Sequence, residues 1–271
     1  MTRLPKTDPL LEIKNLSVRF KSYGKTTPIL NNVSFSLESQ KTLGIVGESG
    51  CGKTVTALSI LNLIPSPPLE RITGEIRFNG ENLLKLSPKK LRRIRGKEIA
   101  YIFQEPMTAL NPVYTVGEQI SEMIRTHENV GRKEATERGI WLLNEVGITN
   151  PTSRMNSYPH QISGGMRQRV MIAIALSCDP KILIADEPTT ALDVTIQAQV
   201  LELFKTLIEK RRMSIIFVTH DLGVIAEIAD EVIVMRKGAV VESNSVEAIF
   251  HQPVHPYTKS LVQLLTGEDT R

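Results

Sequence analysis

The stretch TLGIVGESGCGKT, residues 42–54, decides the fold. Residues 42–46 form a short apolar strand, and GESGCGKT after them fits the phosphate-loop pattern G-x-x-x-x-G-K-[ST]. In such a loop, glycines let successive N–H groups converge on phosphate oxygens, the lysine adds positive charge and the last hydroxyl ligates Mg²⁺. A chance glycine-rich turn is disfavoured because a predicted helix, residues 55–64, follows the loop. The residues assigned to this triphosphate site are Gly47, Glu48, Ser49, Gly50, Cys51, Gly52, Lys53 and Thr54.

Two acids follow another apolar strand in ILIADEP, where residues 182–185 precede Asp186 and Glu187. Because the carboxyl ends of parallel strands gather at one sheet edge, these acids are expected to meet the phosphates. Asp186 suits the Mg²⁺ shell, usually through water. Glu187 points to the other side of the strand and can hold the attacking water. Acids that cap a strand are often merely solvated, but four preceding apolar residues argue against that here.

Two further polar residues end predicted strands: Gln104 follows residues 99–103, and His220 follows residues 215–219. Each, taken alone, is more often a structural residue than a catalytic one. At a shared sheet edge, however, Gln104 is placed to contact the metal or water, and His220 to contact the γ-phosphate.

ISGGMRQR, residues 162–169, has the composition of a second anion site. Ser163, Gly164 and Gly165 stand where a helix can begin, and a helix N-terminus offers unpaired N–H groups. Considered alone, the simpler interpretation is an ordinary N-cap made by Ser163.

Composition limits the class of protein. The chain has 271 residues, a net charge of +4 and two cysteines, Cys51 and Cys178, too few for a disulfide framework or a four-thiolate metal site. A reducing cytosol is the natural compartment. The N-terminus lacks an apolar core of signal-peptide length, and the longest apolar runs are shorter than a bilayer span. The basic stretch 85–97 has no interleaved aromatic residues, which favours a solvated helix face over a nucleic-acid patch.

Buried strands alternate with helical sequence, which predicts a largely parallel sheet covered on both faces. Residues 10–20 and 33–37 alternate like half-buried strands separated by the turn-rich KSYGKTTP. Residues 115–146 have helical periodicity, and residues 232–235 and 239–241 resemble a hairpin. The expected segments are a β subdomain with the phosphate loop, a helical subdomain, the rest of the core and a tail, at 1–104, 105–164, 165–250 and 251–271.

In this order, the motifs resemble those of the nucleotide-binding subunit of an ABC transporter over nearly the whole chain. The resemblance implies an α/β P-loop NTPase core with a mostly parallel sheet, an N-terminal antiparallel β subdomain and an inserted helical subdomain. It also implies ATP and Mg²⁺ as cofactors. The implied assignments are Walker A at residues 47–54, Q-loop at Gln104, Walker B at Asp186, catalytic base at Glu187, D-loop at Asp193 after Ala191 and Leu192, and H-loop at His220.

The resemblance also gives ISGGMRQR a function. It is similar to the signature motif, whose serine and backbone N–H groups bind the γ-phosphate of the other subunit's ATP. Met166 departs from the usual glutamine, a change expected to matter little because Ser163 and the glycine backbone make the contacts. The family further implies an aromatic residue stacked on adenine, for which Phe20 is the first choice and Tyr23 the second.

YPHQISGGMRQRV and the tail HQPVHPYTKSLVQLL resemble ATPases of peptide and nickel importers. No cysteine follows Cys178, so we expect no iron–sulfur cluster of the kind many peptide-importing relatives carry, which weakens the peptide assignment relative to nickel. We predict an ATP-hydrolysing subunit of an oligopeptide or dipeptide importer. The same role in nickel or metal-chelate import is the alternative. A nucleic-acid-associated ABC ATPase is remote, since it needs a long coiled-coil insert.

The implied partners are a second ATP-binding subunit, favoured as a paralogue, two membrane-spanning permease subunits and an extracellular or periplasmic solute-binding protein, with no nucleic acid. The implied location is peripheral, on the cytoplasmic face of the membrane. Within the phosphate loop, backbone amide donors and Lys53 are expected to favour the thiolate form of Cys51. Bulky maleimides are therefore expected to inactivate the protein, and saturating Mg-ATP to protect it.

Overall fold

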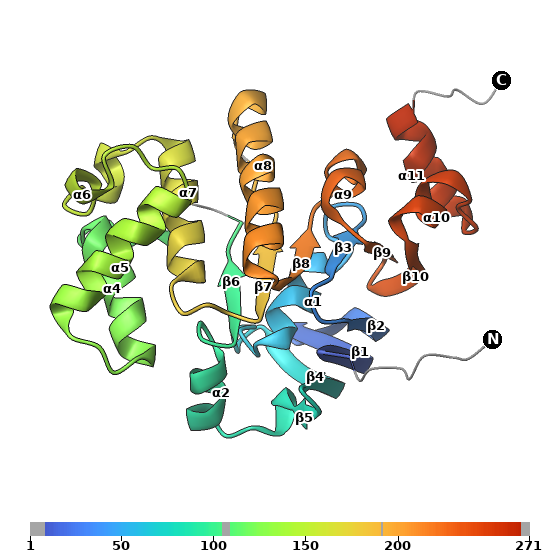
Figure 1. The fold of residues 1–271 in the computed structure, drawn as a ribbon. Coiled ribbons are helices and arrows are strands. Elements are labelled where there is room, and N and C mark those ends of the chain that lie inside the picture. The colour runs from blue at the N-terminus through green and yellow to red at the C-terminus, as the bar shows by residue number, and fades with distance from the viewer. Residues whose placement is uncertain (1–8, 105–108, 191, 267–271) are drawn as a thin grey trace, which may run out of the picture. The chain divides into compact units, whose positions relative to one another are not determined.

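The computed structural model describes residues 9–104, 109–190 and 192–266. Two compact units make up the chain. The first joins residues up to 91 with those from 214 onwards, and the second comprises residues 92–213 (Figure 1).

An antiparallel sheet forms the N-terminal part of the first unit. It comprises β1 (Leu11–Ser22), β2 (Lys25–Leu37), β4 (Leu69–Phe78) and β5 (Glu81–Asn82), in the order β2-β1-β4-β5. The alternation predicted for residues 10–20 is present, since every apolar residue of β1 before Phe20 is buried. They are Leu11, Ile13, Leu16 and Val18.

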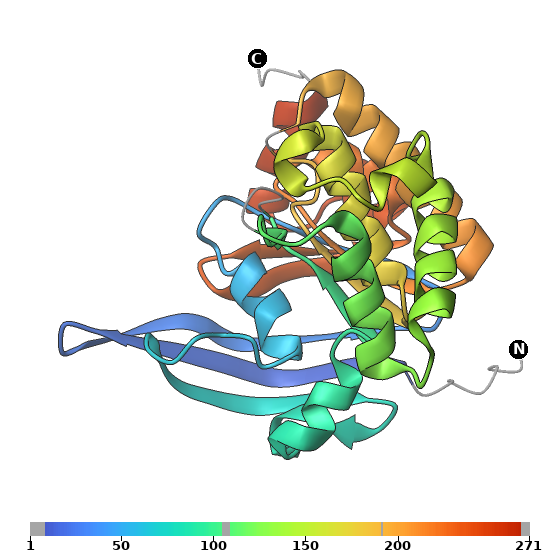
Figure 2. The same cartoon turned by 90° about the vertical axis from the view of Figure 1, so that its left-hand side faces the viewer.

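The hairpin between β1 and β2 is longer than its composition suggests (Figure 2). KTTP belongs to β2, where Arg19 pairs with Pro28, and the turn shrinks to Tyr23 and Gly24. Both turn residues have positive φ, 48° and 76°, as the tight turn that matches strand twist requires. Pairing with β1 therefore overrides the turn-like composition, and β2 tolerates its proline because it is an edge strand of this sheet.

Three parallel strands, an antiparallel strand at their edge and several helices form the rest of the first unit. β3 (Thr42–Val46) lies between β8 (Ser214–Val218) and β9 (Glu231–Arg236), parallel to both. β10 (Ala239–Ser245) closes the predicted hairpin with β9. A Cβ on Gly44 of β3 would lie 2.8 Å from Cγ2 of Ile225, so helix α9 packs directly on this strand. The helices are α1 (Lys53–Ile60), η1 (Leu83–Lys85), α9 (Leu222–Ile228), α10 (Val246–His251) and α11 (Pro256–Thr266).

The second unit pairs two parallel strands, β6 (Ile99–Ile102) and β7 (Ile182–Asp186), with a group of helices. α4 begins at a capping box between Thr115 and Glu118, and its predicted apolar face is buried. The helices are α4 (Val116–His127), α5 (Arg132–Glu145), α6 (Pro151–Arg154), η2 (Pro159–Gln161), α7 (Gly164–Leu176) and α8 (Val194–Arg211).

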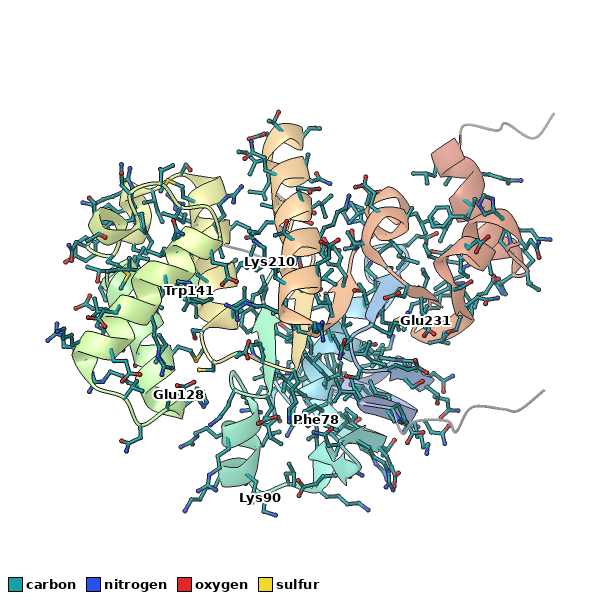
Figure 3. The ribbon with its side chains drawn as sticks, viewed as in Figure 1. Phe78, Lys90, Glu128, Trp141, Lys210 and Glu231 are labelled. Atoms are coloured by element: carbon teal, nitrogen blue, oxygen red, sulfur yellow. The ribbon has the colours of Figure 1, made fainter. Side chains whose placement is uncertain are left out.

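An ion pair joins helices of the second unit. Arg211, at the end of α8, pairs with the carboxylate of Glu145, and both side chains are nearly buried, 10% and 13% exposed. Its guanidinium also donates to the Leu176 carbonyl and lies 5.5 Å from the centroid of the Trp141 ring. Figure 3 labels Trp141 and the neighbouring Lys210. This one side chain therefore links α5, α7 and α8.

The middle of the basic stretch 85–97 forms α2 (Pro88–Ile94), along which the chain passes from the first unit into the second. Its lysines are exposed, as Lys90 shows in Figure 3, while Leu91 is buried. The predicted α/β class, with an antiparallel N-terminal sheet and a mostly parallel one, is confirmed. Across residues 9–104, 109–190 and 192–266, no helix combines the length and apolar character needed to span a bilayer.

Candidate active site

The phosphate loop lies between β3 and α1 in the first unit, and its glycines are required by close contacts. Gly47 has φ 151°, and a Cβ there would lie 2.2 Å from the Met235 carbonyl oxygen. Gly52 has φ 107°, and a Cβ there would meet Cδ2 of Leu30 at 2.6 Å. Any side chain would therefore collide, and the bare backbone presents its N–H groups at the start of α1, where the helix dipole favours an anion.

Lys53 opens α1 and is almost fully buried, with 4% of its surface exposed. Its ammonium donates to the carbonyl oxygens of Gly47 and Glu48 at 2.8 and 3.1 Å. A charged phosphate oxygen is a stronger acceptor than a neutral carbonyl, so the lysine is poised for transfer to one. Thr54 follows it in the first turn of α1 and is half-buried.

His220 leaves the sheet at the same edge as the loop. β3 and β8 are parallel, with Ile45 paired to Val218, so residues after both strands emerge together. The hydroxyl of Thr219 accepts from the Asp221 N–H at 3.0 Å, and Asp221 caps α9 by accepting from Gly223 N–H at 2.8 Å. The backbone on either side of His220 is thus fixed, and its ring is exposed.

The acids of the second unit are held by neighbouring side chains. Because β6 and β7 are parallel with Ile102 beside Ala185, Gln104 and Glu187 emerge together. Gln104 Nε2 donates to Glu187 Oε2 at 3.1 Å, and the Thr190 hydroxyl donates to the same oxygen at 2.9 Å. The structure therefore brings together two predicted residues and adds Thr190, which sequence reasoning missed.

Glu187 has an uncommon backbone conformation, with φ 45°. The left-handed region is costly for a residue with a Cβ and is concentrated at functional sites. Its carbonyl accepts from the Thr190 N–H at 3.1 Å, which closes a turn directly after β7. The strand ends at this turn, and the Glu187 carboxylate there accepts from Gln104 and Thr190.

Tyr101 is a second residue that sequence reasoning missed. Its hydroxyl donates to Asp186 Oδ2 at 2.8 Å. Burial, and then the charge of Asp186, raise the pKa of Tyr101 far above its usual value, so the hydroxyl remains a donor. A hydroxyl within the otherwise apolar IAYI strand was the available signal.

We expect Tyr101→Phe to lower the free energy of unfolding by about 1–3 kcal/mol, because nearly buried Asp186 loses a donor to its carboxylate. Urea denaturation measures the change. The matched control is Tyr114→Phe, since that ring is 49% exposed. Equal stability of the two variants would contradict a stabilising role for the Tyr101 hydroxyl.

The signature residues begin α7 in the second unit. Ser163 is exposed, and its hydroxyl caps the helix by accepting from the Met166 N–H at 3.3 Å. Gly164 is exposed and open, whereas a Cβ on Gly165 would lie 2.8 Å from Cγ2 of Ile196. The simple capping interpretation thus holds within the chain. The N-terminus of this thirteen-residue helix is exposed. An exposed helix N-terminus is also what an anion site needs.

Comparison with known proteins decides the family: the model of the ABC transporter family matches residues 30–190. This chain belongs to the ABC transporter family. The ABC chain is 54% identical over 253 residues to the oligopeptide transport ATP-binding protein OppD of Bacillus subtilis, covering 93% of this chain and 71% of that protein. It is 52% identical to the probable peptide ABC transporter ATP-binding protein y4tR of Sinorhizobium fredii, covering 95% and 77%.

A solved dimer of the ATP-binding cassette MJ0796, in a post-hydrolysis state bound to ADP and phosphate, is similar in fold. Its TM-score is 0.77 at 27% identity, with 87% of this chain and 98% of that chain covered. The ABC chain is therefore a nucleotide-binding ATPase. ATP-binding subunits of ABC importers work with membrane permease components.

The remaining predicted site residues are those of the D-loop and the two aromatic candidates for adenine stacking. Asp193 caps α8 by accepting from the Ile196 N–H at 2.9 Å, and Ala191 of the predicted D-loop lies outside the described residues. Phe20 is half-buried in β1 beside Thr27 and Leu69, whereas Tyr23 is fully exposed at the hairpin tip. Adenine stacking by either remains a prediction.

The donor set of the ABC chain fits Mg²⁺ held jointly with a nucleotide. Among the residues that the structure describes, no group of three or more His, Cys, Asp or Glu could hold a metal ion. Mg²⁺ is usually held by one or two protein oxygens together with substrate phosphates and waters. The hydroxyl of Thr54 in the first unit and the carboxylate of Asp186 in the second are each an oxygen of that kind, and their joint binding of Mg²⁺ stays a prediction.

The expectation that Cys51 favours the thiolate is wrong. The side chain is 6% exposed, and burial raises the pKa of its thiol, outweighing Lys53 and backbone hydrogen bonds, which lower it. Burial likewise raises the pKa of the Cys178 thiol.

We therefore expect both thiols of the native ABC ATPase to react slowly with Ellman's reagent at neutral pH and faster as pH rises, because raised pKa values leave less thiolate. The urea-unfolded chain is the reference, and Cys51→Ser separates the two sites. A native Cys51 that reacts at the unfolded rate at neutral pH would contradict protection by burial.

Proposed function

We propose that this ABC ATPase powers an importer of oligopeptides or dipeptides. The observation that carries the proposal is 54% identity to an oligopeptide transport ATP-binding protein over 93% of the chain. A dipeptide transport ATP-binding protein, DppD of Bacillus subtilis, is 51% identical over 94% of the chain. These relatives favour peptides over the nickel or metal-chelate alternative.

Catalysis in this proposal is positioning and charge neutralisation. The loop amides and Lys53 bind the phosphates. Thr54 and Asp186 would each offer an oxygen to Mg²⁺, which would neutralise phosphate charge. Glu187 orients a water and accepts its proton, and His220 contacts the γ-phosphate. Gln104, already hydrogen-bonded to Glu187, senses the metal or water.

The ATP site is proposed to be shared between two subunits. Ser163 and the exposed N–H groups at the start of α7 would bind the γ-phosphate of ATP on a second ATP-binding subunit, favoured as a paralogue, and Asp193 would lie at the same interface. The predicted segments 1–104, 105–164, 165–250 and 251–271 stay proposals for the phosphate-loop, signature, Walker B and tail regions. Each of these segments includes residues outside the described ranges.

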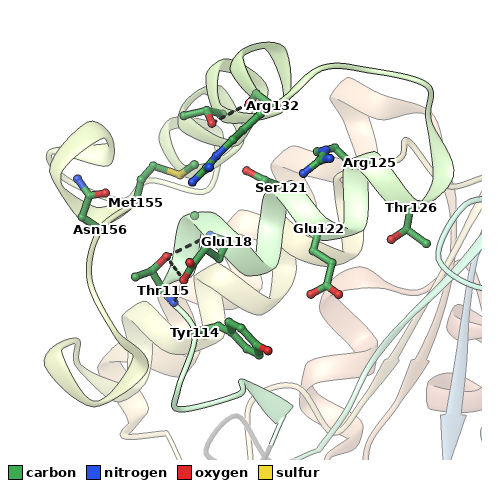
Figure 4. A pocket seen from close by; sticks show the side chains of 12 residues that line it. Tyr114, Thr115, Glu118, Ser121, Glu122, Arg125, Thr126, Arg132, Met155 and Asn156 are labelled. Atoms are coloured by element: carbon green, nitrogen blue, oxygen red, sulfur yellow. Dashed lines mark hydrogen bonds between the residues drawn. The ribbon is translucent and has the colours of Figure 1, made fainter.

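Coupling is proposed to pass through the helical part of the second unit to two permease subunits. A pocket of about 640 Å³ lies among α4, the start of α5 and the residues after α6 (Figure 4). Charged side chains from two helices line it, and Tyr114, 49% exposed, stands at its edge. The charged side chains that line the pocket are Glu118, Glu122, Arg125 and Arg132. Such a mixed lining suits a polar permease segment, and the ATPase would then sit peripherally on the cytoplasmic face of the membrane.

The test is reconstitution with the permeases, the paralogous ATPase and the solute-binding protein in proteoliposomes. We expect di- and oligopeptides to raise ATP hydrolysis and to accumulate inside, while nickel complexes do neither. The reverse selectivity would support the nickel alternative and refute the peptide proposal.

A further inference from the structure

The C-terminal segment reaches the phosphate loop through one tyrosine. Tyr257, in the first turn of α11, is 6% exposed. Its hydroxyl oxygen accepts from the backbone N–H of Glu48 at 3.1 Å, across 209 positions of sequence. Glu48 directly follows Gly47, so Tyr257 contacts the second residue of the phosphate loop.

The ring of Tyr257 is held beside the strand that supports the loop. The guanidinium carbon of Arg236 lies 4.7 Å from the ring centroid, a cation–π contact. Arg236 ends β9, which pairs with β3, and the carbonyl of the preceding Met235 is the atom that approaches Gly47. Loop, ring and strand end therefore form one packed group within the first unit.

The segment before α11 is fixed as well. The Glu242 carboxylate of β10 accepts from the N–H groups of Val254 and His255 at 2.8 and 2.9 Å. His255 Nδ1 accepts from the Tyr257 N–H at 3.1 Å. These bonds tie the backbone leading into α11 to β10, so the position of the Tyr257 hydroxyl is determined by the fold.

Both backbone groups of Glu48 are thus hydrogen-bonded. The Glu48 N–H donates to Tyr257, and the Glu48 carbonyl accepts from Lys53 at 3.1 Å. When Lys53 turns to a phosphate, the tyrosine contact remains. Burial raises the pKa of Tyr257, so its hydroxyl is neutral and acts on the loop through hydrogen bonding.

We propose that Tyr257 is a positioning residue of the nucleotide site: its hydroxyl fixes the Glu48 peptide and so preorganises the following loop amides for phosphate. A loop that is already ordered loses less conformational entropy when its ligand binds. The C-terminal segment thereby belongs to the ATP site without touching ATP. This inference rests on nucleotide binding and is independent of the transported solute.

The test is Tyr257→Phe in the full chain, which keeps the ring and its contact with Arg236 and removes the hydroxyl. Calorimetric titration should show the Kd for ATP and ADP raised about three- to tenfold, the effect of one hydrogen bond. The Kd for adenosine, which has no phosphates, should be unchanged. The nucleotide-free chain should stay folded, with its free energy of unfolding lowered by no more than the loss of one hydrogen bond, about 0.5–1.5 kcal/mol.

Ser260→Ala is the matched control, because it removes another hydroxyl of α11, one that donates to the Pro256 carbonyl at 3.1 Å. It should bind ATP with the wild-type Kd. The proposal is overturned if folded Tyr257→Phe binds ATP as the wild type does, if adenosine weakens equally, or if Ser260→Ala has the same effect. A failure of peptide transport would refute the proposed solute and leave these titrations unaffected.

Discussion

Replacement of Glu187 by glutamine is expected to slow ATP hydrolysis by about 10²–10⁴-fold, the usual contribution of a general base. The amide retains an oxygen that can accept from Gln104 and Thr190, so the turn after β7 should survive. It cannot take a proton from water. ATP binding should persist, and the subunit should accumulate as an ATP-bound dimer, measurable by steady-state phosphate release and by light scattering.

Glu209→Gln provides the matched control, since Glu209 is an exposed carboxylate on α8 of the same unit. It should hydrolyse ATP at the wild-type rate. Wild-type turnover by Glu187→Gln would remove Glu187 from the role of base, and loss of ATP binding would indicate a structural role instead.

Ser163→Arg is expected to abolish hydrolysis at the site completed by this chain's signature motif, while its own phosphate loop still binds ATP. The arginine removes the serine contact and places bulk over the exposed start of α7. Because loss of an N-cap costs only about 0.5–2 kcal/mol, the fold should survive. Site-by-site measurement needs the mutant paired with its partner subunit, with hydrolysis followed separately at each phosphate loop.

Ser153→Arg introduces the same side chain at an exposed position of α6 in the same unit. It should leave both sites active. If Ser163→Arg instead prevents ATP binding by the isolated, folded chain, the motif acts within its own chain and the shared-site proposal is wrong.

Sequence patterns predicted an element correctly where its local residue preferences agree with its packing in the fold. The apolar strand and the glycine-rich loop at residues 42–54 form as expected, and β7 ends at the predicted acid. The helix after the loop was predicted over residues 55–64 but runs from Lys53 to Ile60. The length of β2 could not be predicted, because pairing with β1 overrides the composition of KTTP.

The contacts that hold the site were also beyond local pattern. Tyr101 reaches Asp186 across neighbouring strands, and Tyr257 reaches Glu48 from the far end of the sequence. The state of the Cys51 thiol was mispredicted for a related reason. Nearby positive charge can be read from sequence, whereas the larger effect of burial depends on the completed fold.

The buried ammonium of Lys53 has a consequence for which ligands the loop selects. Because two carbonyls of its own chain already satisfy it, a ligand gains only the difference between those acceptors and its own. An uncharged ligand is no stronger an acceptor than the two carbonyls, so Lys53 gains nothing by leaving them. A charged polyphosphate oxygen is the stronger acceptor, so its binding would exchange the hydrogen-bond partners of Lys53 and would discriminate by charge. The loop is thereby protected against occupation by the many uncharged molecules that could fit its shape.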